Sequence, residues 1–208
     1  LDIQRMSSED GPGLRTTIFF KGCSLACAWC HNPESIPRKF QVHWLKNRCI
    51  GCGSCENVCP NGALTRAPEG IRIDRRLCAG CYACVSACPA VALEGKGQDA
   101  EAADLCRELV KDRAYFGRDG GVTLSGGEAL LQDGAVELLQ LLKAEGVQTA
   151  VDTCGMVFTE QLERALPFTD VLLYDLKIMD DKAHERWTGR GNAMILRNLG
   201  VAALWAKG

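Results

Sequence analysis

Three cysteines near the amino end have a spacing that suits an iron–sulfur cluster. Cys23, Cys27 and Cys30 stand in a CxxxCxxC pattern. Three thiolates can hold three irons of a 4Fe-4S cubane, which has four irons and prefers soft sulfur ligands. The remaining iron then keeps an open position, as in catalytic rather than structural metal sites. The alternatives are a zinc site, which would need a fourth ligand, and a disulfide, which no secretory signal supports.

Eight further cysteines form an internal repeat in the middle of the chain. Each half follows the CxxCxxCxxxCP pattern of bacterial ferredoxins, in which the fourth cysteine ligates the other cluster. Closed cubanes can carry electrons but offer no position to a substrate, so the spacing predicts an electron relay. Clusters that only hold a short insert folded are the alternative. The expected ligand sets are Cys49, Cys52, Cys55 and Cys88 for one cubane and Cys78, Cys81, Cys84 and Cys59 for the other.

Composition narrows the class of protein. The chain has 208 residues, a formal net charge of -2 and a hydrophobic fraction of 47%, which suits one ordinary domain plus a small insert. No basic block favours nucleic acid or a membrane surface, and no apolar run is long enough to span a membrane. Eleven of the thirteen cysteines fall in the metal-type patterns, so we expect a cytoplasmic, anaerobic protein without disulfides. Of the remaining two, Cys106 is expected to be buried in a helix, and Cys154 lies nearer the chemistry.

Strands and helices alternate along the rest of the chain. Apolar periodicity predicts a parallel α/β sheet that curls into a partial (β/α) barrel, with the cluster loop at the carboxyl end of its first strand. We expect residues 1–45 to begin this barrel, 46–95 to form the ferredoxin-like insert with two 4Fe-4S clusters, and 96–208 to continue the barrel. The expected strands are 14–20, 122–125, 147–152 and 171–176, and the expected helices are 99–116, 135–144, 160–166 and 192–206.

The sequence around the three cysteines resembles the radical S-adenosylmethionine enzymes, and its flanks resemble the activating enzymes of glycyl radical enzymes. Residues 8–16, SEDGPGLRT, resemble that family's DGPGxRT segment, and residues 30–34 resemble its CHNPE signature. The resemblance implies an oxidoreductase whose catalytic cluster on Cys23, Cys27 and Cys30 reductively cleaves S-adenosylmethionine. The 5′-deoxyadenosyl radical then installs a glycyl radical on a partner enzyme. A flavodoxin- or ferredoxin-type protein would supply the electron.

The resemblance also implies a set of cofactor-binding residues at strand ends. Gly126, Gly127 and Glu128 resemble the family's GGE, whose backbone and carboxylate hold the methionine ammonium. For Trp29 two roles are open, packing against an adenine, as the family's residue in that slot does, or an ordinary loop anchor, and the same two roles are open for His31. The residues that resemble the family's DT and DxK elements are Asp152, Thr153, Asp175, Leu176 and Lys177.

Each of these strand-end residues has an implied partner. Asp152 is expected at the methionine part and Lys177 at its carboxylate or the ribose, while Asp152, Thr153 and Asp175 would cradle a monovalent cation. Asp10 and Arg15 are expected at the barrel mouth, where they would receive the glycine loop. His43 and His184 are expected to be surface or capping residues.

Two other functions compete with the activating enzyme. A ferredoxin-type electron carrier would explain the eight repeated cysteines but not the CxxxCxxC, GGE and DLK patterns. A radical enzyme acting on another peptide or a small molecule is the closer rival. The pattern stops after the fourth βα unit, whereas the resembled family closes a partial barrel of six, so we expect a truncated chain.

Overall fold

The chain divides into two units, and the computed structural model describes residues 2–207. The larger unit combines Leu1–Arg38 with Asp99–Gly208, and the smaller unit is Lys39–Gln98. Within the described residues, no helix has the length and apolarity needed to cross a membrane.

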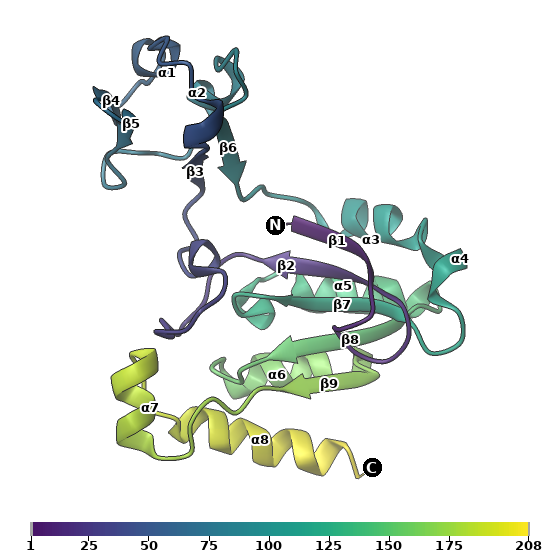
Figure 1. Ribbon diagram of the computed structural model, residues 1–208. Helices are drawn as coiled ribbons and strands as arrows, with labels where there is room; N and C mark the ends of the chain where they lie inside the picture. Colours follow the sequence, from purple (N-terminus) through teal and green to yellow (C-terminus); the bar gives the residue numbers. More distant parts are fainter. Residues whose placement is uncertain (1, 208) are drawn as a thin grey trace. The chain divides into compact units, whose positions relative to one another are not determined.

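A five-stranded sheet organises the larger unit (Figure 1). Its strand order is β1-β2-β7-β8-β9; β2, β7, β8 and β9 are parallel, and β1 pairs antiparallel with β2. The parallel sheet confirms the expected α/β class. The strands are β1 (Asp2–Ser7), β2 (Arg15–Phe20), β7 (Gly121–Gly126), β8 (Gln148–Thr153) and β9 (Val171–Tyr174).

Strand β1 was not expected from the sequence. Its side chains are mostly polar and exposed, so no apolar alternation marks it. It is held by its ladder to β2 and by Arg5, which forms ion pairs with Glu108 and Asp112.

Helices cover the sheet, and α5 and α6 lie on one face of it (Figure 1). The expected helix 99–116 is two helices that begin at Ala102 and Arg113. Helix α7 was missed, although Asp180 caps its first turn and Gly189 ends it with a positive φ, which are ordinary helix boundary signals. The helices are α3 (Ala102–Val110), α4 (Arg113–Phe116), α5 (Ala135–Ala144), α6 (Thr159–Ala165), α7 (Asp181–Thr188) and α8 (Ala193–Trp205), with short 3-10 turns η1 (Pro33–Ser35), η3 (Ala129–Leu131) and η4 (Leu166–Phe168).

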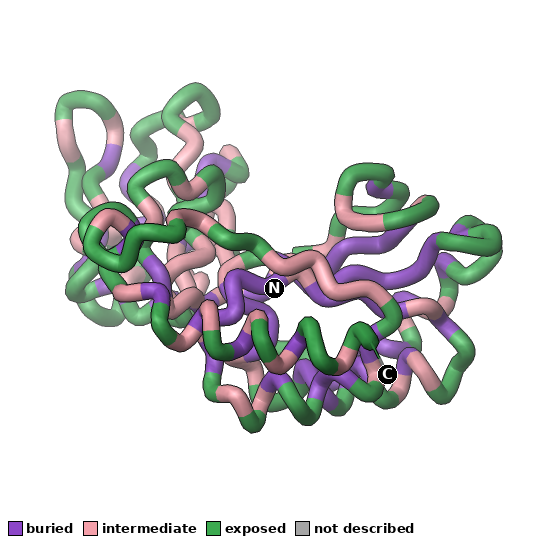
Figure 2. The backbone as a smooth tube through the Cα atoms, turned by 90° about the horizontal axis from the view of Figure 1, so that it is seen from below, coloured by how far each residue is buried: buried purple, intermediate pink, exposed green. Residues whose placement is uncertain are grey.

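The core of this unit lies between the sheet and these helices. Leu138, Leu139 and Leu142 of α5 are buried in the same cluster as Val122 and Leu124 of β7. Figure 2 shows buried residues running along the inner strands of the sheet, whereas exposed and buried residues alternate along the helices. Burying apolar side chains of this size stabilises a fold by roughly 1.5 to 3 kcal/mol each. This packing holds the strand ends in fixed positions. Cys106 is buried in the same core, as expected.

The smaller unit repeats one backbone design twice. A residue with positive φ precedes each four-residue helix, Gly53 before α1 (Ser54–Asn57) and Tyr82 before α2 (Ala83–Ser86). Positive φ also recurs at the paired positions Gly51 and Gly80, and Gly62 and Val91. The sequence repeat is therefore a repeat of structure. The remaining elements are β3 (Gln41–Trp44) paired with β6 (Leu93–Lys96), β4 (Leu64–Ala67) paired with β5 (Gly70–Ile73), and η2 (Lys46–Arg48).

Candidate functional site

A cleft of about 410 Å³ opens at the carboxyl ends of the parallel strands in the larger unit. Its volume is in the range that small-molecule sites occupy, and its position is where α/β folds bind ligands. Residues from four separate strand ends meet in it. Those that carry chemistry are Asp10, Cys23, Cys27, Trp29, Cys30, His31, Ser125, Gly126, Gly127, Asp152, Thr153, Cys154, Asp175 and Lys177.

The cysteine loop is held by backbone hydrogen bonds on both sides. The amide of Ala26 donates to the carbonyl of Thr188 (2.7 Å), and the amide of Ala28 donates to that of Trp187 (2.9 Å). The amide of Cys23 donates to the carbonyl of Ile36 (2.9 Å). The carbonyls at the end of α7 therefore fix the loop between the first and third cysteines.

His184 belongs to this support and not to the surface. The residue is 1% exposed, and its Nδ1 lies 2.6 Å from the carbonyl oxygen of Arg190 and 3.0 Å from the Thr188 hydroxyl. It fixes the turn after α7, so the expected capping role holds, but the surface position was wrong. His43 is exposed, as expected.

The three thiols suit a cluster better than a single ion. Among residues 2–207, no three His, Cys, Asp or Glu side chains are grouped closely enough to hold one metal ion. A cubane spreads its thiolates over different irons, so its ligands need not converge on one point. Cys23, Cys27 and Cys30 line one cleft. The donor set therefore fits a 4Fe-4S cubane that is held through three of its irons.

Cys154 lies directly behind the first of these cysteines. A hydrogen bond with the Cys154 thiol lowers the pKa of Cys23 to about 7, which favours the thiolate that binds iron. The same hydrogen bond, together with burial, raises the pKa of Cys154. Burial raises the pKa of Cys27. Cys154 is therefore a thiol donor beside the cluster loop, a role that its sequence context did not show.

Asp152, Asp175 and Lys177 also line this cleft. Asp152 Oδ2 accepts a hydrogen bond from the Ser125 hydroxyl (2.7 Å), and burial raises the pKa of Asp152. Asp175 and Lys177 form an ion pair. Burial lowers the pKa of Lys177, but the hydrogen bond and charge of Asp175 outweigh burial and raise it. These side chains can therefore meet both the ammonium and the carboxylate of an amino acid.

Glu128 does not line the cleft. It is 1% exposed, and its carboxylate accepts hydrogen bonds from the Thr153 hydroxyl (2.8 Å) and the Cys154 amide (3.0 Å). Burial raises the pKa of Glu128. The carboxylate faces the end of β8, so the structure does not bring it to the place expected for an ammonium.

The two glycines before Glu128 pack against the chain's own backbone. A Cβ on Gly126 would lie 2.4 Å from the amide nitrogen of Phe20, and one on Gly127 would lie 2.4 Å from the carbonyl oxygen of Gly22. The amide of Gly127 donates to the Phe20 carbonyl (2.8 Å). These contacts tie the GGE segment to the start of the cysteine loop, while both glycines also line the cleft.

Three of the other expected residues, Asp10, Trp29 and His31, line the cleft. Leu176 is exposed outside it, between Asp175 and Lys177.

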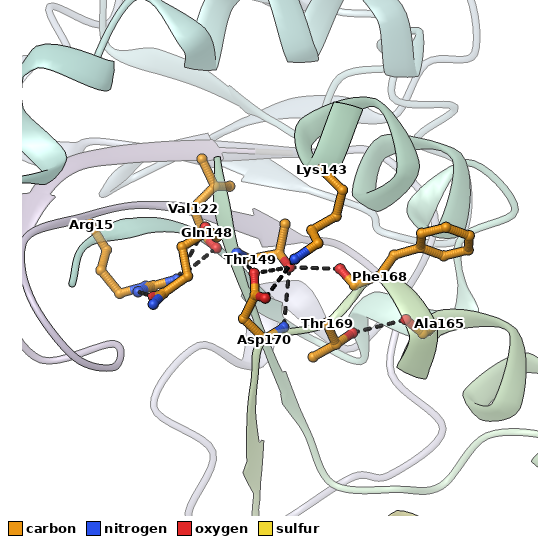
Figure 3. A network of polar contacts seen from close by, with 9 residues as sticks. All are labelled: Arg15, Val122, Lys143, Gln148, Thr149, Ala165, Phe168, Thr169 and Asp170. Carbon is orange, nitrogen blue, oxygen red and sulfur yellow. Dashed lines mark hydrogen bonds and ion pairs between the residues drawn. The ribbon is translucent and has the colours of Figure 1, made fainter. Parts of the chain in front are cut away.

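Arg15 lies at the opposite end of the sheet. It pairs with Gly121 at the start of β7, and its guanidinium donates to the Val122 carbonyl (3.0 Å) and the Gln148 side chain (2.8 Å). Figure 3 shows this network beside that of Asp170. Arg15 is fully buried, so the expected role at the barrel mouth was wrong, and the residue instead joins the amino ends of three strands.

The smaller unit holds two separate cysteine-lined cavities. One, the Cys88 cavity, is lined by Cys49, Cys52, Cys55 and Cys88. The other, the Cys59 cavity, is lined by Cys59, Cys78, Cys81 and Cys84. Each cavity thus takes three cysteines from one half of the repeat and one from the other.

Comparison with known proteins places the chain in a family. Residues 48–92 match the family described as a 4Fe-4S dicluster domain, and residues 9–49 match the 4Fe-4S single cluster domain. The trans-4-hydroxy-L-proline dehydratase activating enzyme of Clostridioides difficile is 44% identical over 97% of this chain and 68% of the relative. The isethionate sulfite-lyase activating enzyme of Desulfovibrio desulfuricans is 44% identical over 97% and 67%. The choline trimethylamine-lyase activating enzyme of Oleidesulfovibrio alaskensis is 42% identical over 95% and 66%.

The chain thus spans about two thirds of the length of these relatives. The similarity includes both the cysteine loop and the double-cysteine repeat. Identity of this extent along nearly the whole chain shows that the protein belongs to the activating enzymes of glycyl radical enzymes, which are radical S-adenosylmethionine enzymes.

Proposed function

We propose that this chain reductively cleaves S-adenosylmethionine and installs a glycyl radical on a partner enzyme. One observation carries the proposal: three thiols of a single loop and the polar ends of three parallel strands line the same cleft. When bound at Cys23, Cys27 and Cys30, a 4Fe-4S cluster supplies the electron that breaks a carbon–sulfur bond of the cofactor, which yields the 5′-deoxyadenosyl radical. The sheet is proposed to be part of a radical S-adenosylmethionine barrel.

The chain's own groups orient the cofactor. Asp152 is poised for the ammonium, and Lys177 for the carboxylate or the ribose, because both side chains face the cleft and carry opposite charge. Trp29, 46% exposed at the cleft, offers an aromatic face to an adenine. The charge of Asp175 helps to raise the pKa of Asp152, so a monovalent cation beside the two carboxylates would relieve their repulsion. The Thr153 hydroxyl donates to Glu128, and its oxygen is proposed as a third ligand of that cation.

Two further 4Fe-4S clusters in the smaller unit would serve as a relay. Four cysteines around each cavity leave no open iron position, so these clusters can pass electrons but cannot bind the cofactor. A flavodoxin- or ferredoxin-type protein is the proposed donor.

The proposed partner is a glycyl radical enzyme. The relatives are named for activating dehydratases, carbon–sulfur and carbon–nitrogen lyases and a decarboxylase. Since the substrates of these partners differ, the shared target is the glycyl radical site itself.

Removal of one cysteine tests the central assignment. Cys27→Ala should lower the iron content of the anaerobically reconstituted chain from about twelve to about eight, and should abolish 5′-deoxyadenosine formation with dithionite. Cys106→Ala is the control, because Cys106 is buried in the helical core. The proposal fails if Cys27→Ala retains both full iron content and cofactor cleavage.

A further inference from the structure

The two cysteine cavities of the smaller unit share a backbone design but not their surroundings. At the end of each half, one amide donates to the fourth cysteine: Ala63 to Cys59 Sγ and Ala92 to Cys88 Sγ, both at 3.2 Å. This backbone hydrogen bond is therefore the same at the two sites. Two side chains, by contrast, differ between them.

The first difference is the indole of Trp44. Trp44 lines the Cys88 cavity and is absent from the lining of the Cys59 cavity. Its Nε1 is buried and has no hydrogen-bond partner among residues 2–207. A buried indole N–H normally finds an acceptor. Sulfur atoms of a cluster in this cavity would supply one.

The ring of Trp44 packs directly against the backbone of Gly70. Gly70 has a φ of +132°, and a Cβ there would lie 2.4 Å from Cζ2 of Trp44. Only glycine therefore leaves room for the ring at this place.

The second difference is a hydroxyl in one half of the repeat. Ser54 Oγ lies 3.4 Å from Cys52 Sγ, whereas the equivalent position in the second half is Ala83. The polar side chains that line the Cys59 cavity are otherwise engaged: Asn61 donates to the Leu77 carbonyl and Tyr82 to the Gly97 carbonyl.

The charged side chains near the two cavities and the exposure of their cysteines do not offset the extra hydrogen-bond donors of the Cys88 cavity. Arg66 lines the Cys88 cavity and pairs with Glu56 at 3.4 Å. The equivalent position in the second half is Gly95, and Arg75, which donates to the Val42 carbonyl, does not line the Cys59 cavity. Each set has one exposed cysteine, Cys52 or Cys81, while the Cys59 set holds more buried thiols.

We propose that the cluster of the Cys88 cavity has the higher reduction potential, so that the first electron entering the relay settles there. The inference rests on the proposed cluster ligand sets. One electron from a one-electron donor converts a 2+ cubane to the 1+ state, and no bond forms or breaks. Hydrogen bonds to sulfur stabilise the more negative reduced cluster, and they raise its potential. Trp44 and Ser54 thus act through this cluster by raising its reduction potential, and they touch no substrate.

A redox titration of the two relay clusters tests the proposal. The full chain carrying Cys23→Ala, Cys27→Ala and Cys30→Ala serves as background, because it should retain only these two clusters. The iron content is measured first. An anaerobic dithionite titration is then followed by electron paramagnetic resonance, in this background and with Trp44→Phe, Ser54→Ala or Ala83→Ser added.

Each variant has its own expected shift. The background should be reduced in two separate one-electron steps. Trp44→Phe keeps an aromatic ring, although a smaller one, and removes the N–H. The potential of the upper step should therefore fall by about 59 mV, which is a tenfold change in the equilibrium constant of a one-electron reduction. Ser54→Ala should lower the potential of the same upper step. Ala83→Ser should instead raise the potential of the other step, since it adds the missing hydroxyl to the Cys59 cavity.

The outcomes separate this inference from the proposed function. An iron content well below about eight per chain would refute the relay and this inference with it. Eight irons with coincident steps, or a lower step that responds to Trp44→Phe, would refute only the inference. If Trp44→Phe fails to fold, the opposite shifts of Ser54→Ala and Ala83→Ser still decide it.

Discussion

Glu128 Oε2 accepts hydrogen bonds from both the backbone amide (3.0 Å) and the thiol (3.1 Å) of Cys154. The carboxylate therefore binds the loop after β7 to the end of β8. The single thiol proton of Cys154 faces two acceptors, Glu128 and Cys23. Glu128 thus positions the strand end that carries Asp152, together with the thiol behind the cluster loop.

Loss of the Glu128 carboxylate should destabilise the larger unit. Glu128→Ala leaves the Thr153 hydroxyl and the Cys154 amide buried without an acceptor. Each unsatisfied group costs about 1 to 3 kcal/mol. Thermal unfolding under anaerobic conditions should show a clear fall in Tm, with exposed Glu163→Ala as the control. An unchanged Tm combined with a tenfold loss of S-adenosylmethionine affinity would instead show direct contact with the cofactor.

Glu128 should also make stability depend on pH. Burial raises the pKa of Glu128 in the native state above the ordinary value of 4.5. Between pH 4.5 and this native pKa, the native state binds more protons than the unfolded state. The contribution is complete below pH 4.5 and is lost as pH rises through the native pKa. Glu128→Gln removes this titration and should flatten the fall in the free energy of unfolding above pH 4.5. The pKa of Asp152 shifts in the same direction, so the difference between the wild type and the variant isolates Glu128. Denaturant unfolding across this range measures it, and a steeper fall in the variant would contradict the assignment.

Arg15 should matter for stability and not for cofactor binding. Arg15→Met removes the donors to the Val122 carbonyl and the Thr123 hydroxyl at a fully buried position. The expected loss of unfolding free energy is about 3 kcal/mol. Arg107→Met is the control, since the ion pair of Arg107 with Asp104 is exposed and should contribute under about 1 kcal/mol. Equal effects of the two variants would mean that the buried network contributes little.

Lys177 should contribute to cofactor affinity without affecting the clusters. Lys177→Met removes the cation that faces the cleft. A charge-assisted hydrogen bond contributes about 1.5 to 3 kcal/mol, so S-adenosylmethionine should bind about ten- to a hundredfold more weakly. Iron content should stay constant, and Lys182→Met on the exposed side of α7 should leave affinity unchanged. Calorimetry measures both variants, and wild-type affinity in Lys177→Met would place the cofactor carboxylate elsewhere.

Local spacing in the sequence determined the cysteine chemistry and most of the elements. Cluster ligands lie within a few residues of one another, so CxxxCxxC and the ferredoxin repeat could be identified without a fold. The four strands of the parallel sheet were predicted for the same reason, because apolar runs such as that of β9 are local patterns.

Only the tertiary structure decided where Glu128 and Arg15 act. The hydrogen-bond partners of Glu128 at the end of β8 are 25 and 26 positions away in the chain, and the partners of Arg15 on Val122 and Gln148 are 107 and 133 positions away. Burial of a charged group is favourable only when such distant partners arrive together, which no local pattern encodes. The sequence placed Glu128 after the correct strand, but the packing of β7 against β8 turned its carboxylate away from the cleft and toward Cys154.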